Sequence, residues 1–191
     1  MLVGATCVAC DGGGGPVCPA CTAGLRPIGA ITVAGLDGAW ALMAYEGVAR
    51  ELIRGLKYTN RRAALGVLAA AATTLVDEVV DVVTWVPAAR AHRRDRGYDQ
   101  GELLARRIGP GVGRPVRRLL VRAAGRPQTG LDRTDRLVGP VLRPRRSVAG
   151  TVLVVDDVVT TGGSLSAAAR ALRTVGAHRV LALALAATPA R

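Results

Sequence analysis

The sequence contains no phenylalanine, and aromatic residues make up only 3% of its 191 residues. The core must therefore be built from Val, Leu and Ala, which suit buried parallel strands and the helices that cover them. Half of the residues are hydrophobic and 21% are charged, a balance that excludes a disordered chain. The length fits one ordinary domain with a small appendage and is too short for two large domains.

Long apolar runs and a basic N-terminal segment are also missing. The longest uninterrupted apolar stretch without a charged residue, about Leu65 to Val76, is too short for a bilayer, which needs about 20 residues. The first residues do not carry the basic segment that precedes the apolar part of a secretory signal. We therefore expect a cytoplasmic protein without membrane insertion.

Lysine and histidine are scarce, and arginine supplies nearly all of the positive charge. Lys57 is the single lysine, and the two histidines, His92 and His178, are too far apart in sequence to suggest a catalytic pair. Residues 90–146 hold 16 Arg against five acidic residues, whereas the rest of the chain has 10 basic and nine acidic residues. Such a segment favours an anionic partner, either phosphate groups or nucleic acid. A solvated arginine-rich surface without a partner is the alternative.

All four cysteines lie in one short string, CVACDGGGGPVCPAC, as Cys7, Cys10, Cys18 and Cys21. They form two C-x-x-C pairs whose Gly-rich spacer can bend back, so that four thiolates can surround Zn(II) in a tetrahedron. Redox pairs or two disulfides are the alternatives, and the missing export signal argues against disulfides. We predict a structural zinc knuckle over residues 1–25 that folds with its metal.

Strand and helix patterns alternate through residues 26–191. Residues 122–147 show almost no periodicity and are predicted to be a long mobile loop. The continuous apolar strands and their alternation with helices imply an α/β fold with a doubly wound parallel sheet. The predicted elements are a hairpin over 26–44, helices from Tyr45 to about Asn60 and from about Arg62 to Val76, a buried strand VVTWVP, a polar loop ARAHRRDRGYDQ, a helix from about Asp99, a strand over 116–121, and a final strand, helix and strand between Thr151 and Ala187.

The string TVLVVDDVVTTGGS joins a strand to a helix through a polar turn. Asp156 and Asp157 come at the carboxyl end of the apolar run, where the strands of open α/β sheets face their ligands. The turn that follows offers glycines, hydroxyl groups and a helix N-terminus, which together favour a phosphate group. Its residues are Thr160, Thr161, Gly162, Gly163 and Ser164. An acid pair followed by a phosphate-binding turn suits a ribose 5-phosphate.

Three other interpretations of this string are weaker. The acidic pocket of a response-regulator receiver uses the first strand of its domain, and only 34 residues follow Asp157 here. A Walker B strand is disfavoured because the glycine-rich lysine motif of the Walker A loop is absent. Asp157 and Thr160 acting only as helix caps is the third alternative.

The string VVDDVVTTGGS resembles the phosphoribosyl pyrophosphate (PRPP) signature of type I phosphoribosyltransferases. The four-cysteine knuckle and the strings YEGVARELIRGLKY, VPAARAHRRDRGYDQ and GRPQTGLDRTDR stand in the order seen in the ComF family, the competence-associated phosphoribosyltransferase-like proteins. The resemblance covers nearly the whole chain. It implies a type I phosphoribosyltransferase-like domain over residues 26–191, after the small N-terminal zinc knuckle.

The resemblance also implies roles for individual residues. Asp156 and Asp157 would be the catalytic residues that bind the ribose hydroxyls of PRPP, and the turn from Thr160 to Ser164 would hold its 5-phosphate. The pyrophosphate would lie at the loop after VVTWVP, with Mg(II) bridging pyrophosphate and ribose oxygens. The pyrophosphate residues would be Arg90, Arg96, Gly97 and Lys57. Residues 122–147 correspond to the loop that closes over the substrate in such enzymes.

The implied function is phosphoribosyl transfer from PRPP to an unidentified acceptor, linked to DNA uptake in natural competence. Thr160 stands where purine phosphoribosyltransferases commonly carry an acid that acts as base, which disfavours purine salvage. The alternative is a non-catalytic accessory protein that binds single-stranded DNA through residues 90–146 and senses a ligand in the PRPP-type site. Competence DNA-uptake proteins would be partners in either case.

Overall fold

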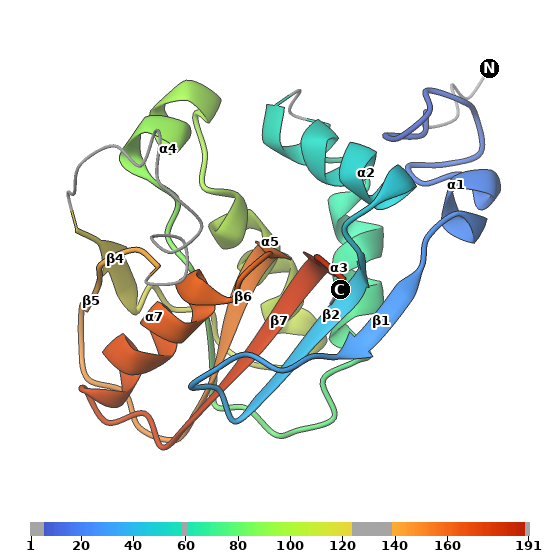
Figure 1. Ribbon diagram of the computed structural model, residues 1–191. Helices are drawn as coiled ribbons and strands as arrows, with labels where there is room; N and C mark the ends of the chain where they lie inside the picture. The colour runs from blue at the N-terminus through green and yellow to red at the C-terminus, as the bar shows by residue number, and fades with distance from the viewer. Residues whose placement is uncertain (1–5, 59–60, 124–138, 190–191) are drawn as a thin grey trace.

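A computed structural model of the chain describes residues 6–58, 61–123 and 139–189. Its main sheet has five strands in the order β1-β2-β7-β6-β3 (Figure 1). Strand β1 is antiparallel to β2, and β2, β7, β6 and β3 are parallel. This arrangement confirms the predicted α/β fold with a mostly parallel sheet. The strands are β1 (Pro27–Ala30), β2 (Gly38–Ala44), β3 (Val82–Trp85), β6 (Thr151–Val159) and β7 (Arg179–Ala187).

The central strands β6 and β7 are apolar without alternation because both of their faces are covered. Val152 to Val155 in β6 are fully buried, and so are nearly all residues of β7. The pairing of these strands runs from Thr151 opposite Arg179 to Val159 opposite Ala187. Their carboxyl ends therefore meet at one edge of the sheet, which we call the carboxyl edge. Figure 1 shows the arrowheads of both strands pointing toward α2 and α4.

Helices cover both faces of the sheet, as a doubly wound fold requires. Helices α2 (Gly47–Tyr58), α3 (Leu65–Thr73) and α5 (Gln100–Gly111) bury leucine, isoleucine and alanine side chains against one face. Helix α7 (Gly163–Arg173) covers the other face and lies to the left of β6 and β7 in Figure 1. No helix in the described part of the chain has the length and apolar character needed to cross a membrane.

Two short elements differ from the sequence-based prediction. The polar string predicted as a loop contains the helix α4 (Arg90–Arg96), which has no buried residue and therefore shows no apolar periodicity. Part of the segment predicted as a mobile loop is the strand β5 (Leu142–Pro144). It pairs with β4 (Leu120–Arg122), so the strand predicted over 116–121 belongs mainly to a separate two-stranded sheet. Residues 124–138, most of the predicted mobile loop, lie outside the described residues.

The four-cysteine segment, with its short helix α1 (Pro19–Ala23), packs against α2. Val8 is buried, and one of its methyl carbons lies 2.9 Å from where a side chain on Gly55 would begin. The Arg61 guanidinium, just beyond α2, donates a 3.1 Å hydrogen bond to the Val8 carbonyl. These contacts fix the cysteine-rich segment on the helix that leads to the carboxyl edge.

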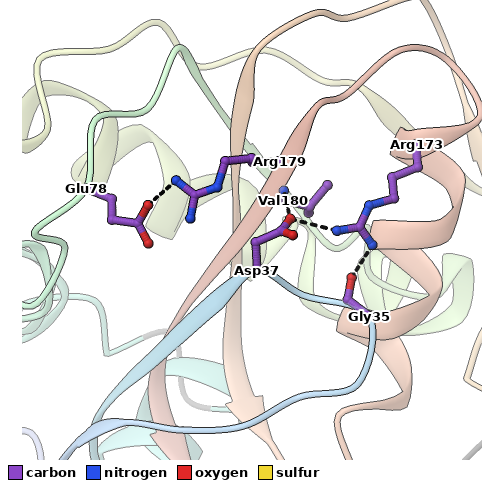
Figure 2. A network of polar contacts seen from close by, with 6 residues as sticks. All are labelled: Gly35, Asp37, Glu78, Arg173, Arg179 and Val180. Carbon is purple, nitrogen blue, oxygen red and sulfur yellow. Dashed lines mark hydrogen bonds and ion pairs between the residues drawn. The ribbon is translucent and has the colours of Figure 1, made fainter.

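We call the opposite edge of the sheet, where the parallel strands begin, the amino edge. It carries a network of ion pairs and hydrogen bonds (Figure 2). Arg173 donates to the Asp37 carboxylate at 2.6 Å and to the Gly35 carbonyl at 2.5 Å. The same carboxylate accepts the backbone N–H of Val180 at 2.7 Å. Arg179 pairs with Glu78. Asp37 and Glu78 therefore each have an arginine partner, while Asp81, just before β3, accepts the backbone N–H of Thr151 at 2.7 Å.

Candidate functional site

The acid pair predicted from the sequence lies in the last part of β6. This strand runs on to Val159, so Asp156 and Asp157 are held by the sheet rather than by a free loop. The backbone N–H of Asp157 donates a 2.8 Å hydrogen bond to the Asp156 carboxylate. The Asp157 carboxylate in turn contacts the Lys57 ammonium at 2.9 Å. The strand and helix α2 together hold both carboxylates at the carboxyl edge.

The two carboxylates differ in their electrostatics. Burial, together with the negative charge of Asp157, raises the pKa of Asp156 to about 7, although the Asp157 N–H and Lys57 act in the opposite direction. Burial disfavours the charged form of Lys57, but the charge and hydrogen bond of Asp157 outweigh it and raise the pKa of Lys57. The site thus combines the 2.9 Å contact between Lys57 and Asp157 with an Asp156 whose raised pKa lets it gain or lose a proton near neutral pH.

The predicted phosphate turn lines a cavity of about 140 Å³ next to Asp156. Gly162 adopts a left-handed backbone conformation (φ 76°) at the start of α7, and a side chain there would meet Val33 at 2.8 Å. Glycine is therefore required for the sharp turn into the helix. All five predicted turn residues line the cavity. A water molecule occupies about 30 Å³ in the liquid, so the cavity has room for a phosphate-sized group.

Arg122 also lines this cavity, at the end of β4. Burial lowers the pKa of Arg122, and the nearby Asp156 charge acts against that effect. No sequence signal distinguishes Arg122 from the many other arginines in residues 90–146. Arg122 belongs to β4, which pairs with β5, and strands of three residues are too short to show a sequence pattern.

A wider and shallower cavity of about 910 Å³ lies on the other side of the same turn. The two cavities share the wall formed by Val159 to Gly162. The remaining lining comes from the region of β1 and the residues after β7, and it contains no acidic residue in the described part of the chain. A ligand in the first cavity would therefore have a mostly uncharged hollow as its neighbour.

The residues predicted to hold pyrophosphate do not gather in one place. Arg90 and Gly97 line a separate hollow of about 550 Å³ at α4. The Arg96 guanidinium donates to the Gln100 side-chain oxygen at 2.5 Å and lies 5.0 Å from the centre of the Tyr58 ring. Lys57 lies with the acid pair. Lys57 thus contacts Asp157, while Arg96 lies beside the ring of the next residue, Tyr58.

Asp99 and Gln100 fix the connection between β3 and α5. Asp99 is buried and accepts backbone N–H groups from Ala88 at 3.1 Å and from Glu102 at 3.4 Å, so it caps α5, a helix that was predicted to begin near this residue. Gln100 is also buried, and its side-chain NH₂ group has no acceptor among the described residues. A buried donor without an acceptor is costly, which makes Gln100 a candidate ligand contact that sequence reasoning missed.

The four cysteines come together as predicted, with all four sulfur atoms within 4.8 Å of one another. The pKa values of two of these cysteines, Cys7 and Cys21, are shifted in opposite directions. Backbone N–H groups, Cys18 first, lower the pKa of Cys7 to about 6 although burial opposes them, whereas hydrogen bonding with Cys10 and burial raise the pKa of Cys21 to about 12. Four convergent sulfur ligands fit a structural Zn(II), whose charge favours the thiolate form of all of them.

Comparison with known proteins agrees with the geometry of the site. Residues 120–191 match the model of the phosphoribosyl transferase domain, a segment that includes β6, the acid pair and the turn. A solved structure described as the allosteric regulatory enzyme of purine biosynthesis is similar over 65% of this chain, at 22% identity and a TM-score of 0.46. The match covers 26% of that longer chain. A search of curated proteins found no match.

The domain match agrees with the prediction of a phosphoribosyl transferase domain in this chain. It covers the C-terminal part only, and the cysteine-rich segment and α2 lie outside it. Both the acid pair and the turn predicted to bind PRPP lie inside the matched residues.

Proposed function

We propose that the protein is a phosphoribosyltransferase of the ComF type, which binds PRPP with Mg(II) and transfers its phosphoribosyl group to an acceptor. One observation carries the proposal: Asp156 and the turn from Thr160 to Ser164 line the same phosphate-sized cavity within the phosphoribosyl transferase match. In this proposal Asp156 and Asp157 accept hydrogen bonds from the ribose hydroxyls. The turn holds the 5-phosphate with backbone N–H and hydroxyl groups, and Arg122 adds positive charge.

The acid pair also fits Mg(II), because carboxylate oxygens are the hard ligands that this ion prefers. When bound with the substrate, Mg(II) supplies positive charge for the leaving pyrophosphate. Residues of the chain hold the rest of the pyrophosphate. We assign this role to the guanidinium groups of Arg90 and Arg96 and to the backbone of Gly97. The unpaired Gln100 donor beside Arg96 supports an anionic group in this region.

The reaction is a displacement at the anomeric carbon of PRPP. The bond from this carbon to the pyrophosphate oxygen breaks, and a bond to a nucleophilic atom of the acceptor forms. The transition state resembles an oxocarbenium ion. The protein therefore positions the reactants and stabilises the developing charge, and it forms no covalent bond with the substrate. The wide cavity beyond Thr160 and Gly162 is the proposed place of the acceptor.

Titration calorimetry with PRPP and Mg(II) tests the proposal. We expect binding by the wild-type protein and its loss, by at least about 100-fold in affinity, in Asp156→Asn with Asp157→Asn, since both hydroxyl-binding charges disappear. Asp77→Asn removes an exposed acid away from the site and is the matched control. A wild-type protein that ignores PRPP, or a double variant that binds it normally, contradicts the proposal. Pyrophosphate release across candidate acceptors then identifies the second substrate.

A second candidate function is the binding of single-stranded DNA, which would place the protein with competence DNA-uptake proteins in the cytoplasm. Exposed residues of α4 and α2 favour it. Arg90, Arg93 and Arg94 are exposed on α4, and the Tyr58 ring, 70% exposed, lies beside Arg96. Arginines attract phosphates, and an exposed ring offers a base a stacking surface.

DNA binding through this surface predicts an affinity that falls steeply with salt. It also predicts that Asp156→Asn with Asp157→Asn leaves DNA binding intact or stronger, because two negative charges are removed elsewhere. A salt-independent affinity argues against an arginine surface. Equal loss of PRPP and DNA binding in the double variant indicates one shared site.

A further inference from the structure

The phosphate-sized cavity has walls from two different parts of the fold. One wall is the turn from Thr160 to Ser164, which follows β6 of the main sheet. The other wall comes from the small sheet of β4 and β5, and we call it the small-sheet wall. It consists of Arg122, which ends β4, and of Gly139 and Pro140, which lead into β5. Because both walls line one cavity of about 140 Å³, a group bound there lies close to both.

Arg122 lies on the inner face of the small sheet, among residues that are otherwise apolar. Residues directly opposite each other on antiparallel strands share a face, and residues two apart along a strand share it as well. Arg122 is opposite Leu142, and Leu120 precedes it by two residues. Both leucines are buried in the core cluster that includes α7. Packing on α7 does not need a charged residue here, whereas the guanidinium places positive charge at the cavity.

Gly139 brings the small-sheet wall against the turn. Its backbone is left-handed (φ 71°), and a side chain there would begin 2.6 Å from the carbonyl carbon of Gly163, the first residue of α7. The nearest atoms belong to the helix backbone rather than to a flexible side chain, so this close approach requires glycine. The Ala123 N–H donates to the Val141 carbonyl at 2.9 Å, which continues the pairing of β4 with β5 to within two residues of Gly139. The contact with Gly163 therefore also sets the distance between Arg122 and the turn.

We propose that the small-sheet wall is the second half of the phosphate site and that Gly139 is its specificity-determining residue. By packing on Gly163 without a side chain, Gly139 lets the wall close on the turn, so that Arg122 and the turn together bind the phosphate monoester of a sugar. A helix N-terminus and a guanidinium both favour such a group. Its assignment to the 5-phosphate of PRPP rests on the proposed function. Pyrophosphate, assigned above to Arg90 and Arg96, does not depend on this wall.

Calorimetry with ribose 5-phosphate, and separately with pyrophosphate and Mg(II), tests the wall one ligand at a time. We expect Gly139→Ala to weaken the binding of ribose 5-phosphate at least about tenfold, because the added methyl group displaces the wall from the turn. Gly113→Ala is the matched control. Gly113 has a similar φ of 66° but no atom within 4 Å of an added side chain, and it lies outside the cavity. The affinity of this control should stay within about twofold of the wild type.

Arg122→Gln removes the charge of the wall without changing the backbone conformation, so it tests the wall even if Gly139→Ala does not fold. We expect the affinity for ribose 5-phosphate to fall at least about tenfold here as well, since a charge-assisted contact is lost. Arg143→Gln is its control, because Arg143 is exposed on the other face of the same small sheet, opposite Val121. This control should also bind within about twofold of the wild type.

The binding of pyrophosphate with Mg(II) should stay within about twofold of the wild type in all four variants. A defect of the whole fold weakens both ligands equally, and that result overturns the proposal. Normal binding of ribose 5-phosphate by Arg122→Gln, or by a folded Gly139→Ala protein, overturns it as well. A wild-type protein that binds ribose 5-phosphate but not PRPP refutes the proposed function, while the variants still decide the role of the wall. A wild-type protein that binds neither ligand refutes both.

Discussion

The two edges of the main sheet carry charges in very different arrangements. At the amino edge, Asp37 and Glu78 each pair with an arginine, and Asp37 also accepts a backbone N–H group (Figure 2). At the carboxyl edge, Asp156 and Asp157 are adjacent and the single ammonium of Lys57 contacts one of them. Asp37 and Glu78 at the amino edge are paired within the protein, whereas the carboxyl edge retains hydrogen-bonding capacity that a ligand can use.

We infer that the charges at the amino edge contribute to stability, whereas those at the carboxyl edge contribute to ligand binding. The arginine pairs of the amino edge are about one-third to one-half exposed on the arginine side, so water screens them and each contributes at most about 1 kcal/mol. The acid pair of the carboxyl edge is shielded from water. The pKa of Asp156 is raised because burial and the neighbouring Asp157 charge disfavour its ionised form. Substitutions at the two edges should therefore affect different properties.

The largest expected contrast concerns two glycines with positive φ, one near each edge. Gly162→Val places a branched side chain within 2.8 Å of Val33 and in a strained backbone conformation, so it should abolish binding of PRPP with Mg(II) and destabilise the fold by about 2 to 5 kcal/mol. Gly35→Ala has φ 82° but open space around it, and should cost about 1 kcal/mol without affecting binding. Calorimetry and chemical denaturation measure both. Normal binding by a folded Gly162→Val protein would remove the turn from the site.

Loss of zinc should disturb the carboxyl edge and spare the amino edge. The cysteine-rich segment packs on α2 beside Gly55, so a strong chelator should release about one Zn per chain and increase hydrogen exchange at the end of α2 at least about tenfold. Amides of β7 next to Asp37 should keep their protection, because they contact no part of that segment. The readout is hydrogen exchange with mass spectrometry, together with elemental analysis. A stably folded, metal-free N-terminal segment contradicts the assignment.

The pH dependence of stability should also distinguish the edges. The pKa of Asp156 is about 7 in the folded protein and about 3.8 in an unfolded chain, so between these values the folded state binds more protons. Stability from this group is therefore highest below about pH 4 and declines toward pH 7, by a few kcal/mol at most. Thermal melting at several pH values should show this decline in the wild type and its loss in Asp156→Asn. An unchanged pH profile in the variant would mean that Asp156 titrates normally.

The smallest expected effect is that of Asp37→Asn at the amino edge. The variant loses a partly exposed pair with Arg173 and weakens the contact with the Val180 N–H, so we expect about 1 kcal/mol of destabilisation. Affinity for PRPP with Mg(II) should stay within about twofold of the wild type. Chemical denaturation and calorimetry check the two values. A large loss of binding would show that the edges are coupled.

Much of this architecture was predictable from local sequence signals. The unit formed by β6, α7 and β7 was predicted because its strands are continuously apolar and its helix follows a glycine-rich turn. The start of α5 was predicted near Asp99, after the polar segment that contains Gly97. Helix α4 was missed because it buries nothing, and β5 was missed because three residues show no period.

The contacts that cross between elements were not predictable in the same way. The resemblance assigned Lys57 to the pyrophosphate, and only the packing of α2 against the sheet and against Val8 reveals that its ammonium contacts Asp157. Arg122 joins the phosphate-sized cavity only through the pairing of β4 with β5. Both contacts depend on distant segments, for which a single sequence carries no local pattern.

A crystal of the protein soaked with PRPP and Mg(II) will show whether Asp156, Asp157 and the turn hold one ligand between them. We predict the 5-phosphate in the cavity formed by Thr160 to Ser164 and the ribose hydroxyls on Asp156 and Asp157. An occupied ligand bound elsewhere, with that cavity empty and Asp156 satisfied by protein groups alone, would contradict it.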